Sequence, residues 1–147
     1  DSVEFCQQNK GLGVYAWCIM TSHIHMIIGT TGKMNLEDII RDLKSFTSGS
    51  LRKEVEASIY ESRKNWMLEI FYNTGKKNKR NKDFQLWQQH NHPVELSTNE
   101  MMDQRLEYIH NNPVVAGFVT APENWQWSSA MDYYETGKGK ILLKFIE

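Results

Sequence analysis

The first part of the chain alternates between polar and apolar stretches in a way that predicts a helix followed by two strands. Residues 2–9 are predicted to form the end of a helix, which Gly11 and Gly13 break. Residues 14–20 are rich in aromatic and β-branched side chains and predict a strand that is apolar on both faces. A short turn at 21–22 leads to a returning strand over 23–29, so we predict an antiparallel hairpin.

Three later segments have the apolar spacing of amphipathic helices. Asn35 is a suitable N-cap for the first, and residues 48–50 (Ser-Gly-Ser) are a candidate interruption of it. The second is predicted over about 62–72. The third opens with a capping box at 97–100 and ends at Pro113, because the residue before a proline disfavours helical geometry.

Between the last two helices the chain is first basic and then alternating. Residues 73–83 contain few apolar side chains and predict a long loop that a polyanion could order. Residues 84–88 alternate apolar and polar side chains and predict a short strand. No repeat or linker divides the sequence, so we expect a single domain over 1–147.

The composition limits the classes of function. A net charge of −1 argues against a protein that coats nucleic acid without specificity. No apolar run approaches the ~20 residues that span a bilayer, and the polar start is not a signal peptide. We therefore expect a cytoplasmic protein with no membrane partner.

Charge is distributed unevenly along the chain. Residues 41–82 contain eleven basic and five acidic side chains, a net charge of +6, so the remainder carries −7. This asymmetry is compatible with a groove that follows phosphates, and equally with solvated helix faces. The candidate DNA-binding residues are Lys44, Arg52, Lys53, Lys76, Lys77, Lys79, Arg80 and Lys82.

Two histidines flank Ile24 at the start of the returning strand. Alternate side chains of a strand share one face, so His23 and His25 point together. Histidine is the commonest metal ligand, which makes the pair a candidate metal site. Two histidines in an apolar strand can equally be ordinary core or surface residues, so the pair needs a third ligand and a reaction before it indicates function.

The last predicted helix carries a second candidate group. Tyr108 and Asn112 are four residues apart and project from one face of the helix. The phenol would be a nucleophile and the Asn112 amide oxygen a third metal ligand, with Asn111 as a competitor because Asn112 precedes a proline. The alternative is a half-buried tyrosine followed by a helix C-cap.

Three sequence blocks occur in a fixed order. They are Met-Thr-Ser-His-Ile-His-Met at 20–26, Tyr-Ile-His-Asn-Asn-Pro-Val-Val-Ala-Gly at 108–117 and Trp-Gln-Trp-Ser-Ser-Ala at 125–130. In this order the blocks resemble the single-tyrosine transposases of the HUH endonuclease superfamily, and most closely the REP-associated tyrosine transposase branch. The similarity extends from about Tyr15 to Tyr134.

This resemblance implies an α+β fold, with helices packed on a ferredoxin-like antiparallel sheet whose first strand we expect to be absent from this chain. It implies a transposase that cleaves and joins single-stranded or hairpin DNA through a 5′-phosphotyrosine intermediate. The implied nucleophile is Tyr108, and the implied ligands of Mg²⁺ or Mn²⁺ are His23, His25 and Asn112. Whether the protein acts as a monomer or a homodimer stays open.

Two other classes of function are compatible with the same residues. The fold could be a catalytically silent module that binds hairpin DNA or RNA. It could also be a small metal hydrolase that combines His23 and His25 with His90 or His92.

Overall fold

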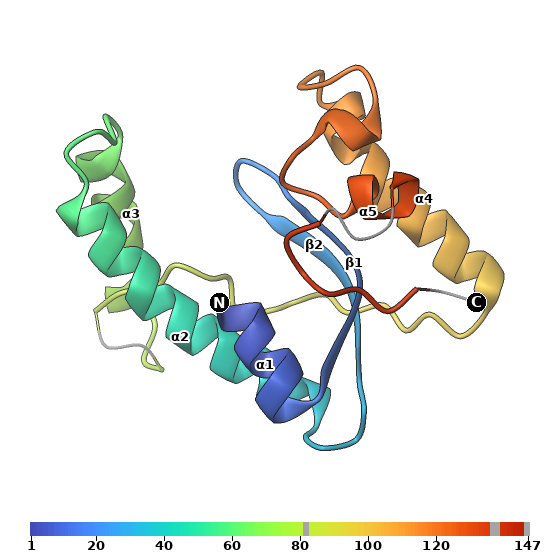
Figure 1. The fold of residues 1–147 in the computed structure, drawn as a ribbon. Coiled ribbons are helices and arrows are strands. Elements are labelled where there is room, and N and C mark those ends of the chain that lie inside the picture. Colours follow the sequence, from blue (N-terminus) through green and yellow to red (C-terminus); the bar gives the residue numbers. More distant parts are fainter. Residues whose placement is uncertain (81–82, 136–138, 146–147) are drawn as a thin grey trace. The chain divides into compact units, whose positions relative to one another are not determined.

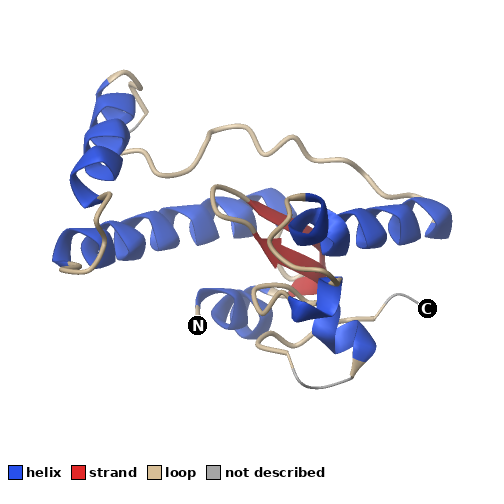
Figure 2. Ribbon diagram, turned by 90° about the horizontal axis from the view of Figure 1, so that it is seen from above, coloured by secondary structure: helices blue, strands red, loops and turns tan. Residues whose placement is uncertain are grey.

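The computed structural model of the chain describes residues 1–80, 83–135 and 139–145, which contain a β-hairpin and several helices (Figure 1). The elements are α1 (Ser2–Lys10), β1 (Leu12–Ile19), β2 (Ile24–Thr30), α2 (Leu36–Ala57), α3 (Lys64–Lys76), α4 (Asn99–Val115), the 3₁₀ helix η1 (Pro122–Asn124) and α5 (Ala130–Tyr134). Figure 2 distinguishes the two strands from the helices and loops. Over the described ranges the fold is α+β with a two-stranded antiparallel sheet, in agreement with the predicted combination of sheet and helices.

The chain divides into two compact units. The hairpin unit contains Val3–Ile39 and the chain from Val94 onward, and the helical unit contains Ile40–Pro93. The hairpin unit therefore holds β1, β2, α4 and α5, whereas the helical unit holds most of α2 and all of α3. The expectation of a single nuclease domain stays a prediction.

β1 is the buried strand of the hairpin unit. Almost all of its side chains are inaccessible to solvent, as expected for a strand that is apolar on both faces. It pairs with β2 in antiparallel register, with Cys18 opposite His25 and an irregularity between Val14 and Ala16. An irregularity of this kind bends a strand locally, and regular pairing resumes at Ala16, two residues before Cys18.

The other edge of β1 also has partners. Ser128 forms an isolated antiparallel bridge with Cys18, and the neighbouring Ser129 donates its backbone N–H to the carbonyl of Trp17 at 2.9 Å. Nearer the start of the strand, the N–H of Lys144 donates to the carbonyl of Val14 at 2.8 Å. Segments from the second half of the chain thus pair with β1 opposite β2.

α4 packs its apolar face on the hairpin. Ile109 is only 5% exposed and belongs to a cluster of buried side chains from β1, the turn and β2. The other buried members are Ala16, Cys18, Met20 and Ile27. Met102 and Leu106 pack against the same cluster, which confirms the apolar stripe predicted for this helix.

The ends of α4 differ from the sequence prediction. Its N-cap is Thr98 rather than Ser97, because the Thr98 hydroxyl accepts the N–H of Met101 at 3.2 Å. Pro113 lies inside the helix and does not end it. The proline lacks an N–H to donate, but the hydrogen bonds of the following residues still form, from Ala116 to Asn112 and from Phe118 to Pro113. The helix stops instead just before Gly117, which takes a φ of 75°.

Two further predictions about the helical unit are wrong. α2 runs without a break through residues 48–50, because one helical glycine costs only about 1 kcal/mol. Residues 84–88 form no strand. Phe84 packs edge-on against Phe71 of α3 with ring centroids 5.5 Å apart, and Gln85 donates its N–H to the carbonyl of Phe71 at 3.0 Å. The alternating segment therefore packs against a helix and not against a strand.

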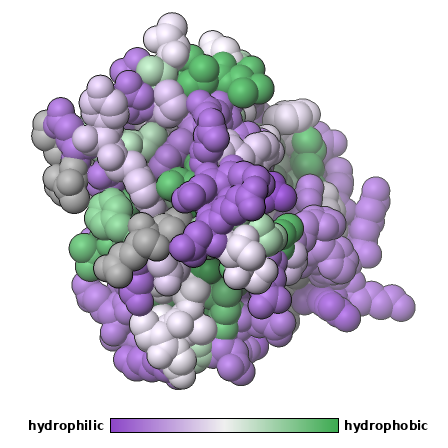
Figure 3. All heavy atoms as spheres, turned by 90° about the vertical axis from the view of Figure 1, so that its right-hand side faces the viewer, coloured by the Kyte–Doolittle hydropathy of each residue, from purple (hydrophilic) through white to green (hydrophobic). Residues whose placement is uncertain are grey.

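Figure 3 shows one face of the molecule, on which hydrophilic side chains dominate and apolar side chains form separate groups. No helix within the described ranges has the length and apolarity needed to cross a bilayer.

Candidate active site

A tight turn places the two histidines at one end of the hairpin. The N–H of Met20 donates to the carbonyl of His23 at 2.9 Å, and β2 begins at Ile24. His23 is therefore the last residue of the turn, and the strand begins one residue later than predicted. The rings of His23 and His25 meet edge to face with centroids 4.7 Å apart, so the structure brings these two imidazoles together.

The two imidazoles have different surroundings. Nδ1 of His23 lies 3.1 Å from the hydroxyl of Ser22 and shares a hydrogen bond with it. Nε2 of His25 is buried and has no hydrogen-bond partner among the residues that the structure describes. Burial, and then the charge of the nearby His23, lower the pKa of His25. The neutral imidazole, which is the form that binds a metal, is therefore favoured at this position.

Tyr108 is the third member of the group. Its ring lies edge-on to that of His25 with centroids 5.6 Å apart, and the side chain is 51% exposed. The packing of α4 explains this contact. Cys18 is the strand partner of His25, and Ile109 packs in the same cluster as Cys18. The residue before Ile109 is thereby positioned at the end of the hairpin that carries the histidines.

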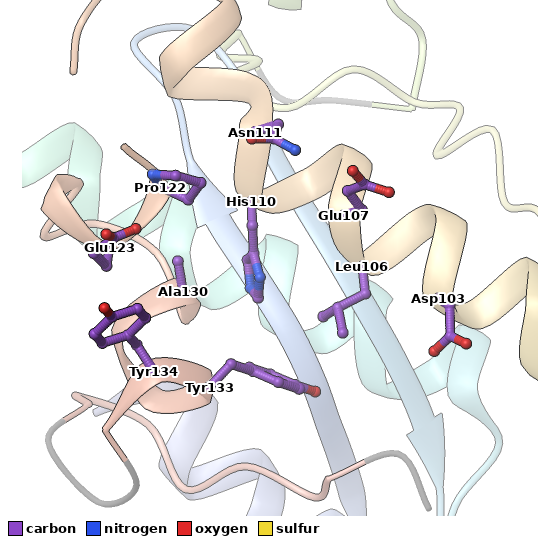
Figure 4. Close-up of a pocket in the computed structure, with 10 residues that line it drawn as sticks. All are labelled: Asp103, Leu106, Glu107, His110, Asn111, Pro122, Glu123, Ala130, Tyr133 and Tyr134. Carbon is purple, nitrogen blue, oxygen red and sulfur yellow. The ribbon is translucent and has the colours of Figure 1, made fainter. Parts of the chain in front are cut away.

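The two asparagines that follow Tyr108 have different roles in the structure. The side-chain amide of Asn112 donates to the carbonyl of Tyr108 at 2.8 Å, which leaves its oxygen as an available acceptor. Asn111 lines a cavity together with His110 (Figure 4).

That cavity has a volume of about 360 Å³ and lies between α4, η1 and α5. Its lining includes three carboxylates, from Asp103, Glu107 and Glu123. Like charges repel, so this cavity is poorly suited to the backbone of a nucleic acid. The exposed ring of Tyr108 is not part of its lining.

His110 links α4 to β1 through hydrogen bonds and is not part of the group formed by His23, His25 and Tyr108. Its Nε2 lies 2.9 Å from the hydroxyl of Ser129, and that hydroxyl accepts the N–H of Trp17 at 2.9 Å. Burial lowers the pKa of His110 to about 4, so the ring is neutral at physiological pH.

Sequence reasoning missed Arg105. The guanidinium carbon of this residue lies 5.7 Å from the centroid of the Tyr108 ring, one helical turn earlier on α4. The spacing of three residues was the available signal, because side chains three apart on a helix are neighbours.

The histidine pair is chemically suited to a divalent cation. Imidazole nitrogen is a common metal ligand, and the buried Nε2 of His25 lacks any other partner in the described part of the chain. Over the same residues, no three side chains of His, Cys, Asp or Glu come together as a metal site. A third ligand would therefore be of another type, such as an amide or a substrate oxygen. His90 and His92 belong to the helical unit, with ring centroids 6.3 Å apart.

The predicted DNA-binding residues lie in the helical unit, and two of them have internal partners. The ammonium group of Lys44 donates to the side-chain oxygen of Asn91 at 2.8 Å. Arg52 forms an ion pair with Glu56 at 2.9 Å, and its guanidinium lies 5.1 Å and 5.2 Å from the ring centroids of Tyr72 and Phe84.

Five other predicted DNA-binding residues are exposed to solvent. Those exposed are Lys53, Lys76, Lys77, Lys79 and Arg80. Lys82 lies outside the described residues. The four exposed residues between 76 and 80 surround the C-terminal end of α3, where positive side chains also interact favourably with the helix dipole.

Comparison with known families decides the identity of the chain. A model of the family described as "Transposase IS200 like" matches residues 2–80, which is more than half of the sequence. The chain belongs to the IS200-like transposase family. Membership in this family implies an enzyme that binds and cleaves DNA. Comparisons with curated proteins and with solved structures find no match. The family match includes both histidines and ends before Tyr108.

Proposed function

We propose that this IS200-like transposase is a metal-dependent endonuclease and strand transferase of the REP-associated branch, which acts on single-stranded DNA next to a hairpin. The observation that carries the proposal is the edge-on contact of Tyr108 with His25, at 5.6 Å between ring centroids. An exposed phenol beside a pair of imidazoles combines a nucleophile with ligands for a cation that can neutralise a phosphate.

In the proposed cleavage step, the phenol oxygen of Tyr108 attacks the phosphorus of a phosphodiester. A bond forms between phosphorus and the tyrosine oxygen, and the bond between phosphorus and the 3′-oxygen breaks. The phenol gives up its proton, and the departing 3′-oxygen gains one. The products are a 5′-phosphotyrosine and a free 3′-hydroxyl. Attack by another 3′-hydroxyl on the phosphotyrosine reverses the step and joins two strands without a nucleotide cofactor.

His23, His25 and Asn112 would hold the Mg²⁺ or Mn²⁺ ion. When bound, the ion supplies electrostatic stabilisation for the non-bridging oxygens of the phosphate. Asn112 is favoured over Asn111 as the third ligand. The side-chain amide of Asn112 donates a hydrogen bond to the carbonyl of Tyr108, whereas Asn111 lines the acidic cavity. Imidazole ligands suit Mn²⁺ better than Mg²⁺, so Mn²⁺ is expected to bind at least as tightly.

The rest of the chain would hold and guide the DNA strand. His25 pairs with Cys18 of β1, and Cys18 packs in one cluster with Ile109 of α4. These contacts would keep Tyr108, the neighbour of Ile109, beside His25 while DNA is bound. The exposed basic residues at the end of α3 would contact phosphates of the hairpin.

The decisive experiment tests for a covalent protein–DNA adduct. The purified chain would be incubated with Mn²⁺ and a pool of labelled single-stranded DNAs, each with a hairpin and randomised flanking bases. Denaturing electrophoresis should reveal an adduct for the parent protein and none for Tyr108→Phe. Tyr134→Phe is a matched control, because this exposed tyrosine lies on α5 of the same unit, and this variant should behave like the parent.

Each possible outcome is informative. An adduct that persists in Tyr108→Phe would refute the assignment of the nucleophile. Hairpin binding by the parent with no adduct in the presence of Mn²⁺ would favour a binding module that has lost its activity.

A further inference from the structure

One positively charged side chain of α4, Arg105, lies beside the proposed nucleophile Tyr108. Arg105 is the sole Lys or Arg in this helix. The acidic residues nearest to it in sequence, Asp103 and Glu107, line the cavity between α4, η1 and α5. The guanidinium of Arg105 instead lies over the ring of Tyr108, with its central carbon 5.7 Å from the ring centroid.

The helix gives Arg105 no carboxylate partner of its own. Ion pairs on a helix form at spacings of three or four residues, and the positions at those spacings are Met101, Met102, Tyr108 and Ile109. Among the described residues, Arg105 forms no ion pair or hydrogen bond, and its contact is the aromatic ring. Its five N–H donors are therefore available to a ligand.

We propose that Arg105 is a further catalytic residue, which binds a non-bridging oxygen of the scissile phosphate while Tyr108 attacks. This inference rests on the proposed function. A guanidinium donates two parallel hydrogen bonds to a phosphate, and Arg105 is held beside the ring whose oxygen would make the new bond.

The proposed role follows from the change of charge during the reaction. A phosphodiester carries one negative charge, and attack by a deprotonated phenol adds a second charge in the transition state. His23 and His25 would bind a metal cation next to Tyr108. Arg105 adds a second positive charge, which belongs to α4 itself. An interaction that strengthens as charge develops accelerates the chemical step more than it strengthens DNA binding.

The test separates chemistry from binding. Single-turnover adduct formation would be measured for the parent, Arg105→Ala and Arg105→Lys. DNA affinity would be measured for the same variants in a Tyr108→Phe background. Loss of one preorganised donor typically slows such a step by about 100-fold, which is the effect expected for Arg105→Ala. Arg105→Lys should recover part of the rate, and affinity should change by less than about tenfold because one phosphate contact is lost.

Chemical rescue and a matched control complete the design. Added guanidinium ions should restore part of the rate of Arg105→Ala, which a purely structural role would not allow. Lys140→Ala removes a cation that lies 4.5 Å from the ring centroid of Trp127 in the same unit, and this variant should keep the parent rate.

The outcomes distinguish this inference from the proposal on which it depends. If the parent forms the adduct and Arg105→Ala is equally fast, the role of Arg105 is refuted and the proposed function stands. A slow Arg105→Ala that neither lysine nor guanidinium restores would also refute it. If the parent forms no adduct at all, both proposals fail.

Discussion

The ring of Tyr108 on α4 meets the ring of His25 on β2 edge-on, with centroids 5.6 Å apart within one chain. Both residues belong to the hairpin unit, and the buried Ile109 fixes the helix on the strands beside them. The proposed nucleophile and the buried histidine of the proposed metal site thus lie in contact within one chain.

We predict that each protein molecule assembles its own active site. Tyr108→Phe and His25→Ala should each abolish adduct formation, and a mixture of the two variants should stay inactive, because no molecule in the mixture holds both groups. Adduct yield on hairpin DNA measures the effect. A mixture that regains a quarter or more of the parent yield would show instead that tyrosine and histidines come from different molecules.

Metal binding should depend on the histidine pair of the hairpin unit. His23→Ala and His25→Ala should each weaken Mn²⁺ binding by more than roughly tenfold, because loss of even an outer partner of a metal site typically costs that much. Titration followed by electron paramagnetic resonance measures the affinity. His92→Ala is the matched control, since His90 and His92 lie in the helical unit. Weakening of equal size in His92→Ala would contradict the proposed site.

Two adjacent basic residues of α2 should behave differently when they are replaced. Arg52 is held by Glu56 and by the rings of Tyr72 and Phe84, so Arg52→Ala should lower the melting temperature. Lys53 is exposed, so Lys53→Ala should leave the melting temperature unchanged.

The same pair separates structural from DNA-binding effects. If Lys53 contacts a phosphate, Lys53→Ala should reduce the dependence of single-stranded DNA affinity on salt by about 0.7 in the logarithmic slope. Equal melting temperatures for the two variants would show that the interactions of Arg52 add no stability.

The sequence predicted those parts of the fold that depend on local pattern. The apolar strand at 14–20 was predicted because both of its faces are buried. The helix that packs on it was predicted because Met102, Leu106 and Ile109 form one apolar face. His23 and His25 lie together as expected, although His23 belongs to the turn and only His25 to the strand.

The wrong predictions have tertiary and local causes. Residues 84–88 alternate like a strand, but Phe84 packs against α3. Pro113 is tolerated within α4 since the hydrogen bonds around it still form. Arg105 was missed although it lies three residues before Tyr108, because an exposed arginine is common on a solvated helix face and does not by itself indicate function.

Acid should destabilise the folded protein through His110. Its pKa is about 4 in the folded state and 6.5 in the absence of burial, so the unfolded chain binds the additional proton. The stability that neutral His110 contributes is complete above pH 6.5 and is lost as the pH falls from 6.5 towards 4. At pH 5 this loss is about 2 kcal/mol by linkage from those two values.

The variant His110→Gln isolates this effect, because glutamine can still bond to Ser129 but does not titrate. Urea unfolding at pH 7.5 and pH 5 measures the free energy of unfolding for the parent and the variant. The parent should lose more stability than the variant over this interval. If both lose the same amount, the buried ring is not the group that titrates, and the link from α4 through Ser129 to β1 does not depend on the protonation state of His110.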